Sequence, residues 1–459
     1  RGGGLFLSEI VVVMTSSSVR RRWLTVEQAG HPRRLYEGEF MGRRSFRREA
    51  WLVYLLACAF VTVSAILQLR SWNWTLFDTR IYLDATTKTL NGTADLYEGR
   101  FGDGWPFTYP PFAVLAFAPL AALARSVATA LLTLGSLVAL FRICWLLADR
   151  SIAQWRLGER APAPGLATGA LTPLVAAGGV LLAARSDAVG GTLAFGQINL
   201  VMAWFVVEDY LGLGRRRLAG ARLSGVLTGL AAGVKVTPAL AAVPRLFTRD
   251  HASALRALGA GVVTVGVSAI VLPHEVVTYF TSALWDTSRP GAPESEWNQS
   301  LSGLVARVMH DVPGAGLVRL LVIAAALVAG VFVTAALLRR DDDVGAVLVI
   351  FVTTGAVSPI TWYHHLVLVP LFAVWAILAT RGWAKGLYPA ISAQAFLLGL
   401  WVLTGMYQSV PRDNGAELHH DPLETVISEA VPVLSLTILL TLAAAIARSR
   451  RATEPHPTR

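Results

Sequence analysis

The chain has 459 residues, of which 54% are hydrophobic and only 15% are charged, and its net charge is +10. Water-soluble domains carry about a quarter charged residues, so this composition excludes an ordinary soluble enzyme and predicts a polytopic membrane protein. The basic residues fall in short clusters between apolar runs. This pattern favours a role in membrane topology over nucleic-acid binding.

The two ends of the chain are polar and basic. Residues 1–50 are expected to form a disordered cytoplasmic segment, in which Met14 and Met41 are candidate translation starts. Residues 51–447 are expected to form the membrane domain, and residues 448–459 a cytoplasmic tail. Four arginines precede the first apolar run, so the positive-inside rule places the N-terminus in the cytoplasm.

The apolar runs predict an all-α bundle of about twelve membrane crossings with both termini inside. Residues 110–124 would cover only about 22 Å as a helix and are expected to be re-entrant or interfacial. Residues 219–247 have basic ends and a break at Lys235-Val-Thr-Pro238. They are expected to form two short antiparallel helices with Lys235 near the outer apex. The other spans are expected at 51–69, 128–148, 166–184, 194–213, 258–272, 315–338, 344–357, 366–379, 387–406 and 426–447.

The first outer loop contains the segment Asp78-Thr-Arg-Ile-Tyr82. A spacing of four residues places Asp78 and Tyr82 on one side of a helical turn, where the carboxylate could face a cavity. The alternative is a solvated loop carboxylate. Tyr109, in Phe107-Thr-Tyr-Pro-Pro111, lies where the chain re-enters the apolar layer, which is also typical of an interfacial aromatic belt.

Lys235 is the most informative charged residue, because an ammonium at a helix break in an apolar region is costly unless it is paired or reaches water. Nearby helix ends would suit a phosphate, while the alternative is a lysine that snorkels to the interface. Arg185 and the segment Gly196-Gln197-Ile-Asn199 occur where two spans meet the outer surface. Gln197 and Asn199 could equally serve helix packing.

Two outer segments complete the set of unusual polar motifs. The first contains Asn298 and Gln299, and the second is Ser358-Pro-Ile-Thr-Trp-Tyr-His-His365. Adjacent histidines point in different directions on a helix, so a shared metal is not expected, and a phosphate or sugar fits better. The pair His419 and His420 is expected to be simple surface. Cys58 and Cys144 sit inside apolar runs, so neither a disulfide nor a metal site is expected.

Taken in order, these segments resemble glycosyltransferase family 87, the polyprenyl-phosphate-mannose-dependent α-1,2-mannosyltransferases of actinobacteria. The matching pieces are Asp78–Tyr82, Asp95–Tyr97, Thr108–Pro111, Gly196–Asn199, Lys235–Pro238, Asn298–Leu301 and Ser358–His365. The resemblance implies a type C glycosyltransferase fold with its active site under the outer loops. It also implies a lipid-linked sugar donor and no cofactor or metal. The chain departs from the family pattern at Ile81, where Val is more usual, and at Tyr363, where Asp is more usual.

The resemblance further implies roles for individual residues in an inverting transfer. Asp78 is expected to be the general base, because one carboxylate suffices for a single displacement. The donor phosphate is expected to be bound by Lys235, His364, His365 and Arg185. The substrate is expected to be bound by Arg80, Tyr82, Tyr109, Gln197, Asn199, Asn298, Gln299 and Trp362.

The expected activity is transfer of mannose to a mannosylated glycolipid at the outer face of the plasma membrane, as in phosphatidylinositol mannoside or lipomannan assembly. The expected partners are the lipid donor, the glycolipid acceptor and the bilayer, and no nucleic acid. The alternative is a polytopic transporter or lipid flippase, suggested by the broken helix at Lys235. Against it, the sequence has no visible repeat and few charges within its spans. The sequence does not reveal the acceptor, the donor sugar beyond the resemblance, or the oligomeric state.

Overall fold

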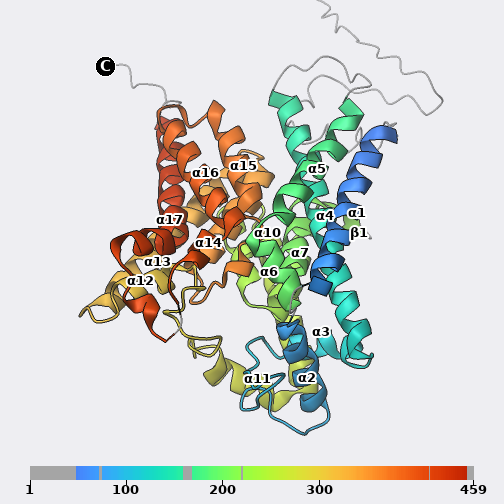
Figure 1. The fold of residues 1–459 in the computed structure, drawn as a ribbon. Helices are drawn as coiled ribbons and strands as arrows, with labels where there is room; N and C mark the ends of the chain where they lie inside the picture. Colours follow the sequence, from blue (N-terminus) through green and yellow to red (C-terminus); the bar gives the residue numbers. More distant parts are fainter. Residues whose placement is uncertain (1–47, 72–74, 159–167, 219–220, 413, 452–459) are drawn as a thin grey trace, which may run out of the picture. The chain divides into compact units, whose positions relative to one another are not determined.

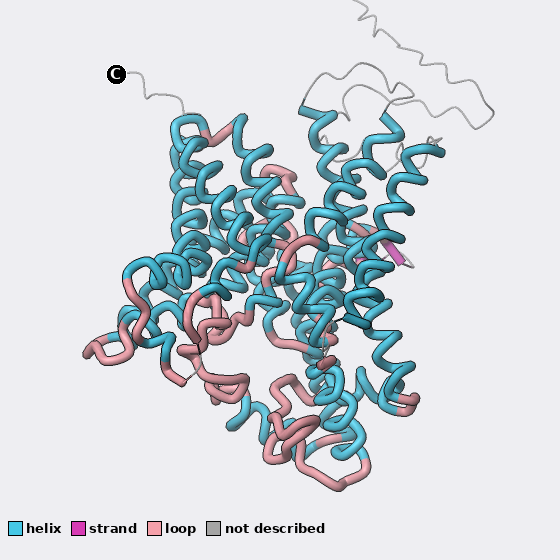
Figure 2. The backbone as a smooth tube through the Cα atoms, in the orientation of Figure 1, coloured by secondary structure: helices cyan, strands magenta, loops and turns pink. Residues whose placement is uncertain are grey.

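The computed structural model describes residues 48–451 except 72–74, 159–167, 219–220 and 413. The predicted cytoplasmic segment up to residue 47 and the tail from residue 452 lie outside the described residues. The described chain is almost entirely helical, as predicted (Figures 1 and 2). Its first helices are α1 (Arg48–Ser71), α2 (Phe77–Leu90), α3 (Phe112–Ala121), α4 (Arg125–Gly158), α5 (Thr168–Ala184), α6 (Asp187–Phe195) and α7 (Asn199–Leu211).

A two-residue antiparallel pair, β1 (Arg217–Leu218) and β2 (Ala221–Arg222), follows α7. The remaining helices are α8 (Val226–Val234), α9 (Val243–Leu246), α10 (His251–Val271), α11 (Pro273–Thr278), α12 (Leu301–Val308), α13 (Ala315–Arg339), α14 (Asp343–Val357), α15 (Val369–Ala379), α16 (Tyr388–Thr404) and α17 (Pro422–Arg451). Helices α1, α4, α5 and α7 pack as one group, and helices α13 to α17 pack as another. Helix α14 belongs to the second group and also contacts α7 of the first group.

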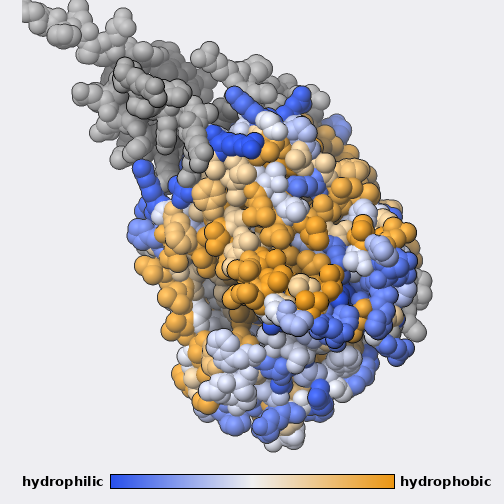
Figure 3. Space-filling model, turned by 90° about the vertical axis from the view of Figure 1, so that its left-hand side faces the viewer, coloured by the Kyte–Doolittle hydropathy of each residue, from blue (hydrophilic) through white to orange (hydrophobic). Residues whose placement is uncertain are grey.

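The helices are those of a multi-pass membrane protein. Six of the described helices, namely α1, α4, α10, α13, α16 and α17, are long and apolar enough to cross a bilayer, and the bent pair α5 and α6 would make a seventh span. Large apolar side chains on α1 and α10 are exposed, as suits lipid contact. On the face shown in Figure 3, an apolar band adjoins a hydrophilic lower end. Helices α3, α14 and α15 are shorter, and the count of about twelve crossings stays a prediction.

One end of the bundle gathers basic side chains. Arg150 on α4 and Arg215 both form ion pairs with Asp343, with N–O distances of 3.1 and 2.5 Å. Arg340 donates to the hydroxyl of Ser449 near the end of α17. Because Arg150, Arg215 and Arg340 lie in three different predicted cytoplasmic loops, their gathering at one end agrees with the predicted topology.

The segment from α8 to α9 folds back on itself, as predicted for residues 219–247. The carboxylate of Asp209 accepts the Gly225 amide at 2.8 Å before α8, and lies 3.3 Å from Arg245 of α9. Both ends of the segment therefore meet at one buried carboxylate. Lys235 follows the last residue of α8 and occupies the apex of this hairpin.

The predicted span at residues 194–213 is wrong at its start. Helix α6 ends at Phe195, α7 begins at Asn199, and α6 bends by 71° from α5. Gly196 ends α6 with φ +65°, and a Cβ there would lie 2.0 Å from the Thr79 hydroxyl. The break between α6 and α7 therefore requires glycine at position 196. It leaves Gln197 and Asn199 at a turn instead of inside a span.

Candidate functional site

The carboxylate of Asp78 lies in the first turn of α2, where the helix dipole favours a negative charge. Helix α2 is held against the turn after α6, since the Leu76 amide donates to the Ala194 carbonyl at 3.2 Å and the Thr79 hydroxyl donates to the Gly196 carbonyl at 3.0 Å. Asp78 is partly buried. The predicted helical turn thus directs the carboxylate toward the protein instead of open solvent.

Gln197 links Asp78 to two tyrosines. Its Oε1 accepts hydrogen bonds from the hydroxyls of Tyr82, at 2.8 Å, and Tyr109, at 3.0 Å. The Gln197 side chain also lies close enough to Asp78 to lower the pKa of that carboxyl. Tyr82 and Asp78 therefore share one face of α2, as their spacing predicts.

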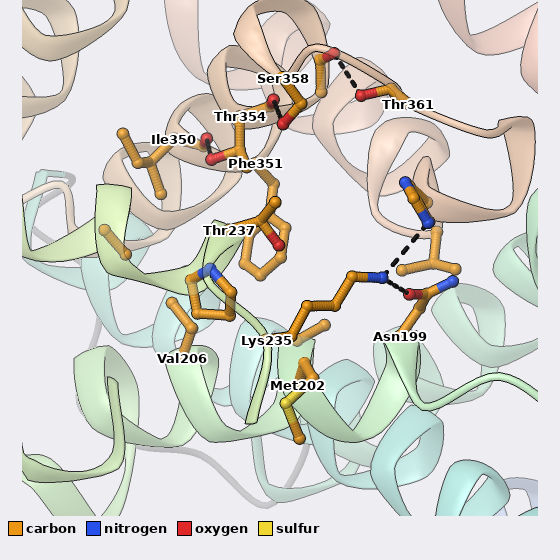
Figure 4. Close-up of a pocket in the computed structure, with 16 residues that line it drawn as sticks. Asn199, Met202, Val206, Lys235, Thr237, Ile350, Phe351, Thr354, Ser358 and Thr361 are labelled. Atoms are coloured by element: carbon orange, nitrogen blue, oxygen red, sulfur yellow. Dashed lines mark hydrogen bonds between the residues drawn. The ribbon is translucent and has the colours of Figure 1, made fainter. Parts of the chain in front are cut away.

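Lys235 reaches the same cluster from the apex of the hairpin (Figure 4). Its Nζ donates to Asn199 Oδ1 at 2.8 Å and lies 3.3 Å from His365 Nε2. The ammonium also lies 5.2 Å from the centre of the Tyr109 ring. The ammonium has polar partners within the protein, which argues against the snorkelling alternative.

The loop that carries the two histidines is fixed by buried polar contacts. Asn298 Oδ1 accepts the Thr361 amide at 2.9 Å, and the Gln299 amide donates to the Thr361 carbonyl at 2.7 Å. The His364 carbonyl accepts from Thr192, at 2.7 Å, and from Asn199, at 2.9 Å. Asn298 and Gln299 thus shape the site through the backbone of a neighbouring loop.

A cavity of about 60 Å³ opens beside Lys235 and His365. It lies between the hairpin, α7 and α14, and its lining is mostly apolar (Figure 4). The cavity therefore joins a positive charge to a hydrocarbon-like surface, which is the combination that a lipid phosphate requires.

The predicted site residues do not all meet at this cluster. The structure brings together Asp78, Tyr82, Tyr109, Gln197, Asn199, Lys235, His364 and His365. Arg80 instead forms an exposed ion pair with Asp103 at 2.8 Å. Arg185 is exposed at the bend between α5 and α6. The Trp362 ring lies against the backbone of Gly291.

Sequence reasoning missed a second buried network that supports the loop before α12. The Arg307 guanidinium binds Glu429 at 2.6 and 2.8 Å and the Ser295 carbonyl at 2.7 Å, and it lies 3.8 Å from Glu296. Glu429 is 122 residues from Arg307 in the sequence. The only available signal was an arginine inside an apolar helix.

The site lies about 20 Å from the basic end of the bundle. Helix α14 runs from Asp343, which binds Arg150 and Arg215, to Val357. The next residue, Ser358, lines the cavity. The fourteen steps along the helix from Asp343 to Val357, at about 1.5 Å each, correspond to about 21 Å. The candidate site and the basic cluster are therefore at opposite ends of the same helix.

The burial of Asp78 and Lys235 shifts the pKa values of both groups toward neutral pH. Desolvation raises the pKa of Asp78 to about 7, although the Gln197 hydrogen bond and the Lys235 charge oppose the shift. Desolvation lowers the pKa of Lys235 to about 8, against the charge of Asp78. Burial and the Lys235 charge lower the pKa of His365 well below its ordinary value, so this imidazole is neutral.

These shifts predict a narrow pH optimum for any reaction that needs the Asp78 carboxylate and the Lys235 ammonium together. Below about pH 7 Asp78 gains a proton, so kcat/KM should rise about tenfold per pH unit up to that point. Above about pH 8 Lys235 loses its proton, and kcat/KM should fall. Initial rates from pH 5 to 10 at constant ionic strength would measure both limbs. An acid limb centred near pH 4 would contradict the assignment.

Comparisons with known proteins find a matching family and similar sequences. The model of glycosyltransferase family 87 matches residues 107–359. A polyprenol-phosphate-mannose-dependent alpha-(1-2)-phosphatidylinositol pentamannoside mannosyltransferase of Mycolicibacterium smegmatis is 30% identical over 300 residues, which cover 64% of this chain and 68% of the relative.

Two relatives in Mycobacterium tuberculosis are similar to the chain over comparable lengths. One, which has the same name as the Mycolicibacterium smegmatis relative, is 32% identical over 59% of this chain and 58% of its own length. The other, a polyprenol-phosphate-mannose-dependent alpha-(1-2)-phosphatidylinositol mannoside mannosyltransferase, is 30% identical over 66% of this chain and 69% of its own. No solved structure matches the chain significantly.

Proposed function

The chain belongs to glycosyltransferase family 87, and on that premise we propose that it transfers mannose from a polyprenyl-phosphate-mannose donor to a mannosylated phosphatidylinositol, forming an α-1,2 linkage. The donor and the linkage are those in the names of its relatives. The observation that carries the proposal is a partly buried carboxylate, Asp78, on which the charge of the Lys235 ammonium acts, while Lys235 itself lines an apolar cavity.

The proposed reaction is a single displacement. An acceptor hydroxyl oxygen attacks the anomeric carbon of the donor mannose, and the bond from that carbon to the phosphate oxygen breaks. The Asp78 carboxylate takes the hydroxyl proton, and the electron pair of the broken bond leaves with the polyprenyl phosphate. Because attack occurs opposite the leaving group, a β-linked donor gives an α-linked product.

The proposed donor subsite consists of Lys235, His365 and the cavity. The developing phosphate charge needs stabilisation more than protonation, since a phosphate is already an acidic leaving group. Lys235 supplies the positive charge, and a neutral His365 can donate one N–H. The first part of the isoprenoid chain then occupies the apolar cavity between α7 and α14.

The proposed location of the reaction is the outer face of the plasma membrane. The basic cluster around Arg150 and Arg215 is at the opposite end of α14 from the cavity. Under the positive-inside rule that cluster is cytoplasmic, which supports an outer site.

A direct transfer assay tests the proposal. The purified protein in lipid vesicles would receive polyprenyl-phosphate-mannose labelled with ¹⁴C and a phosphatidylinositol mannoside. The expected result is labelled glycolipid from which an α-1,2-specific mannosidase releases the label. Absence of label in the glycolipid, while the donor stays bound or is moved across the bilayer, would instead favour the transporter alternative.

A further inference from the structure

The His364 side chain is a buried polar group without a partner. It is 5% exposed, and neither ring nitrogen has a hydrogen-bond partner among the residues that the structure describes. Only its backbone carbonyl is bonded, to Thr192 and Asn199. Buried imidazole nitrogens are normally paired, so an unpaired ring beside a site points to a ligand that supplies the missing bond.

His364 and His365 face different surroundings although they are neighbours in the sequence. Their rings are 4.9 Å apart and nearly perpendicular, at 88°. His365 approaches Lys235, at 3.3 Å. His364 instead lies with its ring centre 5.3 Å from each of the Phe195 and Tyr363 rings. The pair therefore has one side toward the donor phosphate and another toward an aromatic cluster.

The aromatic cluster ends at an exposed positive charge. Trp297 lies 6.4 Å from Phe195 and 5.6 Å from Tyr363, and the Arg412 guanidinium lies 5.6 Å from the Trp297 ring centre. Arg412 is exposed, and its one hydrogen bond to a described residue is to the Gln408 carbonyl, at 2.8 Å. Its remaining donors can bind an anion.

This cluster is near Asp78 as well. Phe195 of the cluster lies between Ala194 and Gly196, whose carbonyls accept hydrogen bonds from the α2 segment on either side of Asp78. An inverting displacement brings the acceptor to the anomeric carbon from the side opposite the leaving phosphate. With the phosphate at Lys235 and His365, the acceptor must approach from another side, and there His364 and Arg412 offer unsatisfied polar groups.

We propose that His364, Trp297 and Arg412 form an acceptor subsite that binds an anionic glycolipid. A ring nitrogen of His364 hydrogen-bonds a hydroxyl of the acceptor sugar, and Arg412, held over Trp297, binds the phosphate of the lipid head group. This inference rests on the proposed function and adds the residues that bind the acceptor, with a sugar hydroxyl at His364 and the lipid phosphate at Arg412.

The test compares two acceptors and three variants of the full chain. The acceptors are a phosphatidylinositol mannoside and the uncharged octyl α-mannoside. His364→Phe keeps a ring against Phe195 and Tyr363 but removes both nitrogens, so kcat/KM for either acceptor should fall about tenfold. His364→Gln should recover part of the loss. Arg412→Gln should raise the KM of the charged acceptor about fivefold, more at low salt, and leave octyl α-mannoside unaffected.

The donor serves as the internal control. The KM of polyprenyl-phosphate-mannose, and the stabilisation of each variant by that donor against thermal unfolding, should match the wild type. Trp285→Leu removes a 71% exposed indole elsewhere and should change neither KM.

Each failure has a separate meaning. Wild-type protein that transfers no mannose contradicts the proposed function. Wild-type transfer with an unchanged acceptor kcat/KM in His364→Phe contradicts the acceptor subsite alone, as does a rise in the donor KM. Equal effects of Arg412→Gln on both acceptors contradict the phosphate contact.

Discussion

Replacing Asp78 by Asn should lower kcat for mannose transfer by about a thousandfold. Asn has nearly the same shape as Asp but cannot take the proton of the acceptor hydroxyl, and a positioned general base contributes about 10²- to 10⁴-fold. The Gln197 side chain can still hydrogen-bond an amide, so donor binding should persist. The measurement is initial-rate transfer with saturating acceptor, alongside donor-induced stabilisation against heat.

Asp84→Asn is the matched control on the same helix. Asp84 forms an ion pair with Lys88 at 2.9 Å and accepts the Gly102 amide, away from the cluster at Gln197. Its removal should leave kcat within twofold of the wild type. If the Asp78 variant keeps more than a tenth of the activity, another group accepts the proton.

Replacing Lys235 by Met should lower kcat by about 10²- to 10³-fold. Met preserves an unbranched side chain in the hairpin but removes the charge that stabilises the negative charge of the leaving phosphate. Loss of one such group raises the activation free energy by about 3–4 kcal/mol. The donor KM should also rise, because the ground-state phosphate is charged too. Kinetics over a range of donor concentrations would separate the two effects.

Two variants make the Lys235 result specific. Lys235→Arg keeps the charge with a different shape and should retain more activity than Met. Lys88→Met removes an ammonium that is 43% exposed on the outer helix α2 and should have little effect. A Lys235→Met protein with less than a threefold defect would show that the phosphate is bound elsewhere.

The sequence predicted the parts of this molecule that local physics determines. The four-residue spacing of Asp78 and Tyr82 placed both on one face of α2, and both contact Gln197. The basic ends and the Lys235-Val-Thr-Pro238 break predicted a hairpin, which Asp209 closes by binding Gly225 and Arg245. Helix periodicity predicted the first feature, and the position of the charges relative to the membrane predicted the second.

Contacts between distant segments were beyond the reach of the sequence. The break between α6 and α7 depends on Gly196 and Thr79, which are 117 residues apart. The different directions of His364 and His365 arise in a short 3₁₀ turn, Tyr363–His365, which is held by Thr192 and Asn199. Arg80 and Arg185, whose roles the resemblance implied, lie elsewhere: Arg80 pairs with Asp103 and Arg185 is exposed. Sequence alone does not give the direction of a charged side chain before its neighbours are placed.

The placement of the donor is the central claim, and a cryo-electron microscopy map tests it most directly. The Asp78→Asn protein, unable to turn over, would be imaged in a lipid nanodisc with polyprenyl-phosphate-mannose bound. We expect phosphate density against Lys235 Nζ and His365, the isoprenoid chain in the cavity between α7 and α14, and the mannose next to residue 78. Phosphate density at the basic end near Arg150 and Arg215, or a mannose remote from residue 78, would contradict the account.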